Sequence, residues 1–415
     1  MPLLKQDENG FHTGNTKHVW DLEKLKKEHR VLVEYRYEKK PIERGYAGRT
    51  LYINLSTGEI KEKLVSEEMK EKFTGGRGFG LKLLWESLKP TTRWNSEENE
   101  LVVTNGPMCG ITQYPGSGKA ICLTVSPSTD IICDSNVGGN VGPFLKFAGF
   151  DALEIQGKAK EDVIIIIDGE EGVVRVETAP LEEVNTHLLA EQLTYMYASE
   201  DSEQARLKVA VLSTGKGAEH SYWGCLNSSF WDVRRKVARV KQAGRGGLGT
   251  VMRDKKLKAL VIKVEKLSGE LNNPVDSEKI AEVGIKMHKE IRDLDRYQCN
   301  MRTVGTGHLV EIMDAYDLLP TENYRFGSFP KASKIYSPKF YELFTQAIAD
   351  GCWFGCTMAC SKAVDGYQVR TGPYKGEKVT VDGPEYETIA CGSNMGIWDP
   401  LWILEFNFYC DTYGI

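Results

Sequence analysis

The sequence predicts an α+β first domain with a largely β core, followed by one or more α-helical domains. Between residues 45 and 267, short apolar runs alternate with Gly, Asn and Asp turn signals, which is typical of sheets. After Pro274 the apolar positions recur at steps of three and four residues, the period of an amphipathic helix. We therefore expect a first domain over residues 45–267 and a helical region over residues 268–415.

Individual elements follow from the same patterns. Strands are expected at residues 51–55, 163–167, 207–212 and 257–264. Helices are expected at residues 66–73, 81–87, 277–291 and 402–409. Residues 1–44 are rich in Lys and Glu, with one short helical pattern at 20–25, and this composition predicts an N-terminal extension appended to the first domain.

Composition limits the class of protein. A chain of 415 residues with 41% hydrophobic and 10% aromatic side chains can bury more than one core. Its net charge of -5 provides no overall basic field, which argues against a nucleic-acid-binding role. No stretch approaches the about 18 apolar residues of a membrane span, and residues 1–19 are too polar for a secretory signal. We therefore expect a cytoplasmic protein that acts on a small molecule.

Three of the ten cysteines are close together and indicate a metal centre. Cys352, Cys356 and Cys360 lie within nine residues, so one loop could aim all three thiolates at an iron-sulfur cluster. In a cytoplasmic chain, reduced thiols or metal ligands are more natural than disulfides. Zinc remains an alternative, although it usually takes paired C-x-x-C units and the sequence has no second pair. Free buried thiols, or a radical enzyme with a slightly different spacing, are further alternatives.

Several glycine-rich loops could approach a phosphorylated cofactor. Glycine lets backbone N–H groups approach anionic oxygens, and an arginine adds a bidentate donor. Such loops lie at residues 74–80, 105–107, 136–140 and 243–249, and none fits a dinucleotide-binding or Walker pattern. Taken singly, each loop is more often a tight turn. A basic cluster beside the last loop could supply phosphate charge or could be a solvated helix face; it consists of Arg234, Arg235, Lys236, Arg239, Lys241 and Arg245.

Seven short motifs in a fixed order resemble the aldehyde:ferredoxin oxidoreductases, from about residue 45 to the last residue. They lie at 76–80, 126–127, 142–151, 243–249, 255–259, 383–387 and 411–414. The resemblance implies a tungsten or molybdenum ion held by a pair of molybdopterins, a magnesium ion that bridges the pterin phosphates, and a nearby [4Fe-4S] cluster. The first domain would then be a pterin-binding domain.

Carried over by position, the resemblance assigns roles to particular residues. The [4Fe-4S] ligands would be Cys352, Cys356 and Cys360. The cofactor contacts would be Lys119, Asn136, Gly138, Lys241, Gln242, Gly244, Arg245, Asp411 and Ile415. Lys119 and Lys241 stand where the family has arginine, which keeps the charge and loses the guanidinium fork. The first cysteine gap is one residue longer than usual.

Other family features are altered or missing. The family repeats its D-x-x-G-L motif later in the chain together with the fourth cluster cysteine, so we expect this sequence to be the N-terminal two thirds of a longer protein. The fourth ligand could otherwise be Cys391 or Cys410. The interfacial E-x-x-H metal motif reads Glu405 to Phe408, so a homodimer would lack that metal.

The resemblance also implies a reaction. Glu387, the second acid of Gly-Pro-Glu-Tyr-Glu, would handle a proton beside the metal, while Glu385 would be structural. A small aldehyde would be oxidised to a carboxylic acid, and its electrons would pass through the cluster to ferredoxin or an electron-transfer subunit. We keep two alternatives: the tungsten subunit of an aromatic acyl-CoA reductase-like complex, with Cys391 near the metal, and a non-catalytic remnant or electron-transfer subunit. No nucleic acid or membrane partner is expected.

Overall fold

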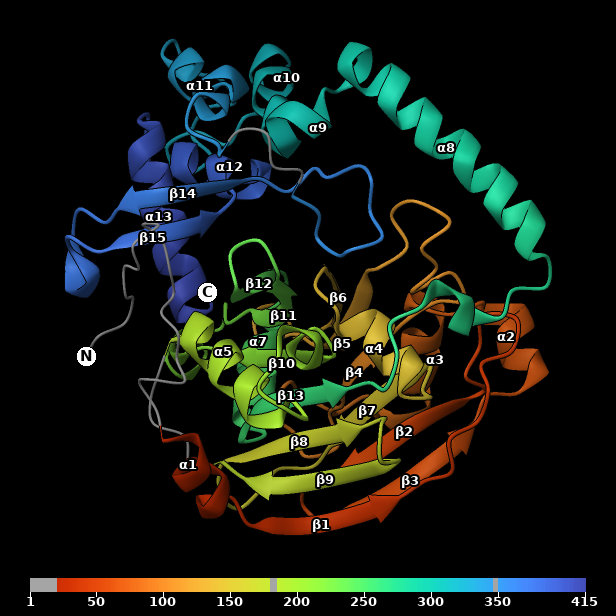
Figure 1. Ribbon diagram of the computed structural model, residues 1–415. Coiled ribbons are helices and arrows are strands. Elements are labelled where there is room, and N and C mark those ends of the chain that lie inside the picture. The colour runs from red at the N-terminus through yellow and green to blue at the C-terminus, as the bar shows by residue number, and fades with distance from the viewer. Residues whose placement is uncertain (1–20, 180–184, 346–349) are drawn as a thin grey trace. The chain divides into compact units, whose positions relative to one another are not determined.

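The computed structural model describes residues 21–179, 185–345 and 350–415 (Figure 1). Internal contacts divide these residues into two compact units. The β-rich unit contains the described residues up to 113 together with 117–280 and 412–415. The helical unit contains residues 114–116 and the described part of 281–411.

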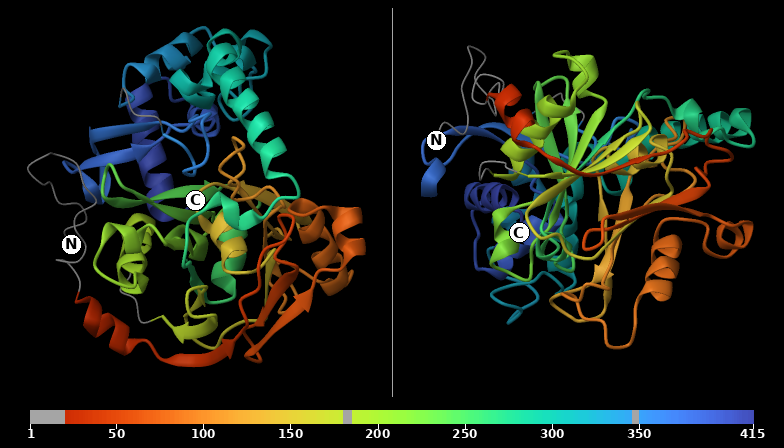
Figure 2. Two further views of the ribbon diagram at one scale, coloured as in Figure 1. Left: turned by 45° about the vertical axis from the view of Figure 1, so that its right-hand side comes forward. Right: turned by 90° about the horizontal axis from the view of Figure 1, so that it is seen from below.

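Two sheets form the framework of the β-rich unit (Figure 2). The strand order of the first sheet is β1 (Val31–Arg36), β9 (Val173–Thr178), β8 (Val163–Asp168), β13 (Leu257–Lys263), β10 (Val209–Thr214), β11 (Leu226–Asp232) and β12 (Val237–Ala243). The order of the second is β3 (Glu59–Leu64), β2 (Arg49–Asn54), β7 (Ala152–Gln156), β4 (Leu101–Thr104), β5 (Ala120–Val125) and β6 (Ile132–Val137). Most neighbouring strands are antiparallel, while β8 pairs with β13 and β2 pairs with β7 in parallel.

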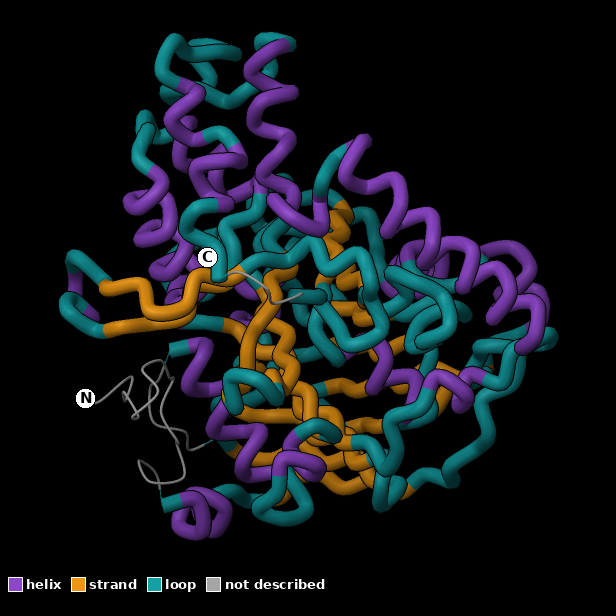
Figure 3. The backbone as a smooth tube through the Cα atoms, turned by 45° about the horizontal axis from the view of Figure 1, so that its top comes forward, coloured by secondary structure: helices purple, strands orange, loops and turns teal. Residues whose placement is uncertain are grey.

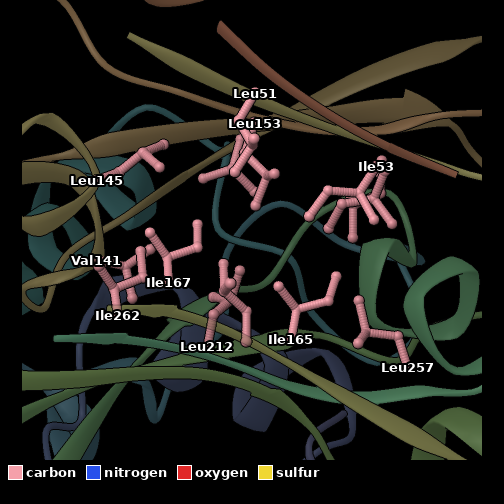
Figure 4. Close-up of a cluster of buried hydrophobic side chains, with 14 of the residues drawn as sticks. Leu51, Ile53, Val141, Leu145, Leu153, Ile165, Ile167, Leu212, Leu257 and Ile262 are labelled. Atoms are coloured by element: carbon pink, nitrogen blue, oxygen red, sulfur yellow. The ribbon is translucent and has the colours of Figure 1, made fainter. Parts of the chain in front are cut away.

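The core of this unit lies between apolar side chains of the two sheets. Figure 4 shows Leu51 and Leu153 of the second sheet facing side chains of the first, such as Ile165 and Ile167. All four are fully buried. Because β8 pairs in parallel with β13 and is buried on both faces, its sequence is a continuous apolar run and does not alternate. Each such side chain stabilises the fold by about 1.5–3 kcal/mol through burial.

Helices cover the sheets and connect the strands. In the β-rich unit they are α1 (Leu22–Glu28), α2 (Glu67–Phe73), α3 (Arg77–Ser87), α4 (Val141–Phe147), α5 (Thr186–Tyr197), α6 (Glu203–Arg206) and α7 (Leu248–Asp254). Helix α2 begins where predicted, because the Ser66 side chain accepts a hydrogen bond from the backbone N–H of Met69. The expected strands at 51–55, 163–167, 207–212 and 257–264 correspond to β2, β8, β10 and β13. The predicted fold class is confirmed.

The N-terminal region differs from the expected appended extension. Strand β1 pairs with β9 along the edge of the seven-stranded sheet, so residues 31–36 belong to the β-rich unit. Its edge position leaves most of its side chains exposed, which is why its polar sequence gave no strand signal. The helical pattern at residues 20–25 is realised as α1 from Leu22 onward, and residue 20 lies outside the described residues.

The helical unit combines helices, loops and a two-stranded hairpin (Figure 3). Its elements are α8 (Ser277–Gln298, from residue 281 onward), α9 (Met301–Val304), α10 (Leu309–Ala315), α11 (Ser337–Tyr341), β14 (Ala363–Gln368), β15 (Lys378–Asp382), α12 (Tyr386–Asn394) and α13 (Pro400–Tyr413, up to residue 411). A separate core includes Val310, Phe340, Ile389 and Ile403. No described helix has both the length and the apolar character that crossing a membrane requires.

The two units divide between residues 280 and 281, later than the expected boundary at 267. The intervening segment is tied to the β-rich unit by hydrogen bonds. Asn272 Nδ2 donates to the carbonyl of Cys109 over 2.7 Å, and the backbone N–H of Arg44 donates to the carbonyl of Asn273 over 2.9 Å. Residues 268–280 therefore belong to the first unit by their contacts.

Candidate functional site

A corner of the β-rich unit brings together two of the glycine-rich loops. The loop after β12 reaches β6, because the backbone N–H of Arg245 donates to Ser135 Oγ over 3.2 Å. The loop after β6 reaches β11, because the backbone N–H of Asn140 donates to the carbonyl of Ser229 over 3.0 Å. Strands β11 and β12 are paired. Residues 136–140 and 243–247 therefore border one region, although about a hundred residues separate them in the sequence.

Glycine is required where this corner is tightest. Gly139 has φ of 73°, a left-handed conformation that side chains other than glycine rarely adopt. A Cβ atom there would also lie 2.7 Å from the carbonyl oxygen of Ser228. Gly244 differs, since a Cβ atom at its position would meet no other atom within 4 Å. The backbone at Gly244 therefore has open space beside it.

Strand pairing places the other predicted cofactor contacts around this corner. Asn136 is exposed on β6, and Gly138 follows it in a buried position. Lys119 is exposed and directly precedes Ala120, which pairs with Val137. On β12, Lys241 pairs with Ser228 and Gln242 pairs with Asn227, while Arg245 is exposed. The predicted contacts from residues 119 to 245 are therefore assembled by β5, β6 and β12.

Buried polar atoms at this corner test whether the residues suit a cofactor. Gln242 Nε2, Ser228 Oγ and Asn140 Oδ1 are buried and have no hydrogen-bond partner within the described residues. Such atoms are uncommon in native proteins, because leaving one unpaired costs about 1–3 kcal/mol. A polar ligand would satisfy them, and the exposed Lys119 and Arg245 would attract its phosphates. The corner fits a phosphorylated, hydrogen-bonding group such as a molybdopterin.

The last residues of the chain contact the same strands. The backbone N–H of Cys225 donates to the carbonyl of Gly414 over 2.9 Å, and a Cβ at Gly414 would lie 3.1 Å from Asn227 Nδ2. Ile415 is half exposed and packs on Gly217, where a Cβ would lie 2.8 Å from its Cγ1. Since Asn227 pairs with Gln242, the predicted contact Ile415 belongs to a segment that adjoins the β11–β12 pair.

The basic cluster is not a helix face, and that alternative is wrong. Residues 234–239 form the turn and first part of the β11–β12 hairpin. Arg235 and Arg239 both contact Asp232 Oδ2, at 2.9 and 3.2 Å. Burial alone would raise the pKa of Asp232, but these two arginines lower it. Asp232 thus offsets part of the charge that this cluster presents.

In the helical unit, the predicted catalytic acid lies at the start of α12. The peptide bond between Gly383 and Pro384 is cis, and Glu387 is exposed in the first turn of the helix. The backbone N–H of Tyr386 donates to Thr306 Oγ1 over 2.9 Å, and that of Gly383 donates to the carbonyl of Lys362 over 2.7 Å. These bonds fix the segment that carries Glu387.

The cysteine loop, residues 351–361, is anchored at several points. The side chain of Trp353 is buried, and an isolated bridge joins Asp350 to Ser361. Thr357, between the second and third cysteines, bonds to two other segments: its carbonyl accepts from Arg302 Nη1, and its Oγ1 contacts His288 Nδ1, both at 2.6 Å. The loop is therefore held from α8 and α9.

Among the described residues, the three cysteines do not form a site for a single metal ion. Cys352, Cys356 and Cys360 are all partly exposed. Across the described ranges, no three His, Cys, Asp or Glu side chains are placed so that they could hold a metal ion. The role of the three thiols as [4Fe-4S] ligands stays a prediction.

The cysteine loop nevertheless ends beside the segment of Glu387. Ser361 Oγ lies 3.5 Å from Glu385 Oε1, and a Cβ at Gly305 would lie 2.9 Å from the carbonyl oxygen of Cys360. Gly305 directly precedes Thr306, the hydrogen-bond partner of the Tyr386 backbone. Three segments, at 305–306, 360–362 and 383–386, therefore meet in the helical unit. Glu385 has a contact with Ser361 there, and its expected structural role stays a prediction.

Two predicted features on α13 have clear contacts. Asp411 is buried and accepts a hydrogen bond from Asn407 Nδ2 over 2.8 Å. Glu405, the remaining acid of the altered E-x-x-H motif, accepts hydrogen bonds from Tyr367 and from Thr371. Burial would raise the pKa of Glu405, but the Thr371 side chain and the other donors lower it. Glu405 is thus occupied by protein donors.

Sequence reasoning missed three residues of these sites. Asn140 lies in a glycine-rich loop that had been noticed, so its position was a usable signal. Ser228 and Asn407 lie in ordinary strand and helix patterns. Their importance comes from strand pairing and from helix packing, which the local sequence does not display.

A glycine-rich corner with unpaired buried polar atoms is typical of a protein that binds a cofactor. Comparison with known proteins specifies the family. Residues 50–264 match the profile of the aldehyde ferredoxin oxidoreductase N-terminal domain, and residues 282–415 match that of domains 2 and 3. The chain belongs to the aldehyde ferredoxin oxidoreductase family, and the resemblance seen in the sequence is confirmed.

Similar proteins include two tungsten-containing aldehyde ferredoxin oxidoreductases. The one from Pyrococcus horikoshii is 32% identical over 89% of this chain, and the one from Pyrococcus furiosus is 31% identical over the same share. An aliphatic sulfonate oxidoreductase, WOR-like subunit, from Pyrococcus furiosus is 29% identical. The chain spans 56% of the length of the first two relatives.

A solved structure shares the fold. It is the active site complex BamBC of benzoyl coenzyme A reductase with 1,5-dienoyl-CoA, with a TM-score of 0.64 and 21% identity. The match covers 90% of this chain and 54% of that one.

Proposed function

We propose that this chain is part of a tungsten or molybdenum bis-pterin oxidoreductase that oxidises an aldehyde to a carboxylic acid. The observation that carries the proposal is the match to both family profiles, with an intact Gly-Pro-Glu-Tyr-Glu segment held beside the cysteine loop. Ferredoxin or an electron-transfer subunit would accept the electrons. The activity is proposed for the whole protein, because the chain spans only part of its relatives.

The β-rich unit would hold the cofactor at its glycine-rich corner. When bound, the metal and its dithiolenes would supply two-electron redox chemistry at the substrate carbonyl. Lys119 and Arg245 would bind phosphate oxygens, together with the magnesium ion, and the open space at Gly244 would admit those oxygens close to the backbone. Gln242 would hydrogen-bond the pterin through its unpaired Nε2.

Glu387 would handle the proton. Oxidation of an aldehyde by water adds an oxygen to the carbonyl carbon and releases protons together with a pair of electrons. A Glu387 carboxylate oxygen would accept the proton of the attacking water from its place in the first turn of α12. Glu385 cannot take this role equally well, because it contacts Ser361.

The cluster is proposed separately. Cys352, Cys356 and Cys360 would provide three ligands of a [4Fe-4S] cluster, with the fourth from Cys391, Cys410 or a segment outside this sequence. Electron paramagnetic resonance of the reduced protein tests this assignment directly.

A second candidate is the tungsten subunit of an aromatic acyl-CoA reductase-like complex. Cys391 favours it, because this thiol lies one helical turn beyond Glu387 on α12. Burial raises the pKa of the Cys391 thiol, and the nearby charge of Glu387 raises it further. In that case a Cys391 sulfur would stand near the metal. Reduction of an aromatic thioester, without aldehyde-dependent turnover, would favour this candidate. A non-catalytic remnant would show neither activity.

The substitution E387Q tests the proposed role. The full-length protein would be purified anaerobically and assayed by aldehyde-dependent reduction of a viologen dye. We expect metal content to stay at the wild-type level and turnover to fall by about 10²- to 10⁴-fold, the usual contribution of a positioned acid or base. E385Q is the matched control and should keep most of its turnover. Unchanged turnover in E387Q would remove Glu387 from this role.

A further inference from the structure

A buried asparagine on α13 connects the predicted cofactor contact Asp411 with the segment of Glu387. Asn407 is 4% exposed and carries two amide N–H groups on Nδ2. One donates to Asp411 Oδ2 over 2.8 Å, and the other donates to the carbonyl of Asp382 over 2.9 Å. Both donors are therefore used, and each goes to a different functional segment.

The second of these bonds lies at the start of the Gly-Pro-Glu-Tyr-Glu segment. Asp382 is the last residue of β15, and the cis peptide bond and α12 follow it at once. The contact continues at Gly383, where a Cβ atom would lie 3.5 Å from Asn407 Oδ1. Asn407 thus fixes the point from which the chain turns into the helix that carries Glu387.

The first bond fixes the orientation of Asp411. Asn407 and Asp411 are four residues apart on α13, so they lie on the same face of the helix. Asp411 is 8% exposed, and a carboxylate this buried needs a hydrogen-bond donor. Asn407 supplies that donor and adds no charge of its own.

Packing between α12 and α13 keeps these groups in register. A Cβ at Gly392 would lie 2.7 Å from Ile403 Cγ1, so the two helices are in close contact. The contact thus places the helix of Glu387 directly against the helix of Asp411.

We propose that Asn407 is a positioning residue that couples the cofactor contact at Asp411 to the placement of Glu387. The inference rests on the proposed function for the roles of these two acids, and it adds Asn407 to that site. A neutral side chain with two donors is needed. Aspartate has the same shape, supplies no donor when ionised, and would place a second negative charge against Asp411.

The substitution N407D separates a positioning role from a merely structural one. Bound pterin and metal would be measured in full-length N407D at about pH 8.5 and about pH 5.5. At the higher pH the two like charges repel, and we expect cofactor content to fall by about tenfold, as for other residues that orient a ligand-holding side chain. At the lower pH the carboxyl pair can share a proton, which restores a donor and recovers much of the cofactor.

N394D is the matched control. Asn394 lies on α12, and its Oδ1 accepts a hydrogen bond from the backbone N–H of Tyr324, which an aspartate can still do. It should retain cofactor at both pH values. Wild-type cofactor content in N407D, or a loss equal at both pH values, would overturn the proposal. If N407D does not fold, the neutral N407S replaces it: cofactor loss in a folded protein supports the proposal, and full retention contradicts it.

A second readout needs no cofactor and distinguishes failure of the inference from failure of the proposed function. Amide hydrogen exchange of residues 383–394 would be followed in cofactor-free wild type, N407D and N394D. Loss of the Asp382 anchor should speed exchange in this segment by about tenfold in N407D alone. If wild type itself binds no pterin, the proposed function fails, and the exchange rates still decide whether Asn407 positions the segment.

Discussion

The substitution E100Q should stabilise the β-rich unit in a pH-dependent way. Glu100 is 1% exposed, and its Oε2 is buried without a partner in the described residues. Burial, reinforced by the neighbouring Glu154, raises the pKa of Glu100 from 4.5 to about 7. At a pH above both pKa values, this difference in pKa means that the charged Glu100 side chain lowers the free energy of unfolding by about 3 kcal/mol.

The sign follows from proton binding. Between the unfolded pKa of 4.5 and about 7, the native state holds more protons than the unfolded state, so wild-type stability falls as pH rises through this window. Glutamine keeps the shape and the acceptor for Gln156 Nε2 and carries no charge. E100Q should therefore be more stable than wild type by about 3 kcal/mol at about pH 8 and by less than about 1 kcal/mol at about pH 5.

Urea unfolding followed by tryptophan fluorescence at the two pH values measures this difference. The exposed Glu98, two residues earlier, provides the control: E98Q should change stability by no more than about 0.5 kcal/mol at either pH. A destabilised E100Q, or a gain that does not grow with pH, would refute the burial argument.

Two further changes test the glycine-rich corner and the α13 network. G139A should lower the melting temperature, because Gly139 has a φ of 73° and an added Cβ would collide with Ser228. G244A should have the melting temperature of wild type but should bind about tenfold less pterin. Equal melting temperatures for the two variants would contradict this. E405Q should lose about 2–3 kcal/mol of stability at about pH 7, since donors such as the Thr371 backbone N–H and hydroxyl need the carboxylate. Because the pKa of Glu405 is lowered in the folded state, its carboxylate stabilises the fold above the unfolded pKa, and this stabilisation is lost as the pH falls. The difference in the free energy of unfolding between E405Q and wild type, measured in urea, should therefore shrink toward about pH 3. A difference that does not change with pH would contradict the prediction.

Elements with strong local signals could be predicted from the sequence. The uninterrupted apolar run of β8 is explained by parallel pairing and burial on both faces, and the N-cap Ser66 set the start of α2. Strand β1 was missed because an exposed edge strand has no apolar alternation. A helix face was kept as an alternative for the basic cluster because the local sequence does not show that Arg235 and Arg239 contact Asp232 in the β11–β12 hairpin.

For the candidate site, too, some parts could be predicted from the sequence and others could not. The glycine-rich loops and Glu387 belong to local sequence motifs, so they could be predicted. The meeting of residues 136–140 with 243–247 depends on which strand edges adjoin, and the role of Asn407 depends on two hydrogen bonds to residues 25 and 4 positions away. Such long-range pairings are set by tertiary packing, which no local pattern encodes.

The most direct test of the whole account is the metal and pterin content of the wild-type protein, purified anaerobically from cells supplied with tungstate. We predict stoichiometric tungsten or molybdenum, together with phosphate from molybdopterin. G244A should reduce both in parallel. A folded protein with neither metal nor pterin would contradict the proposed cofactor site at the β6–β12 corner.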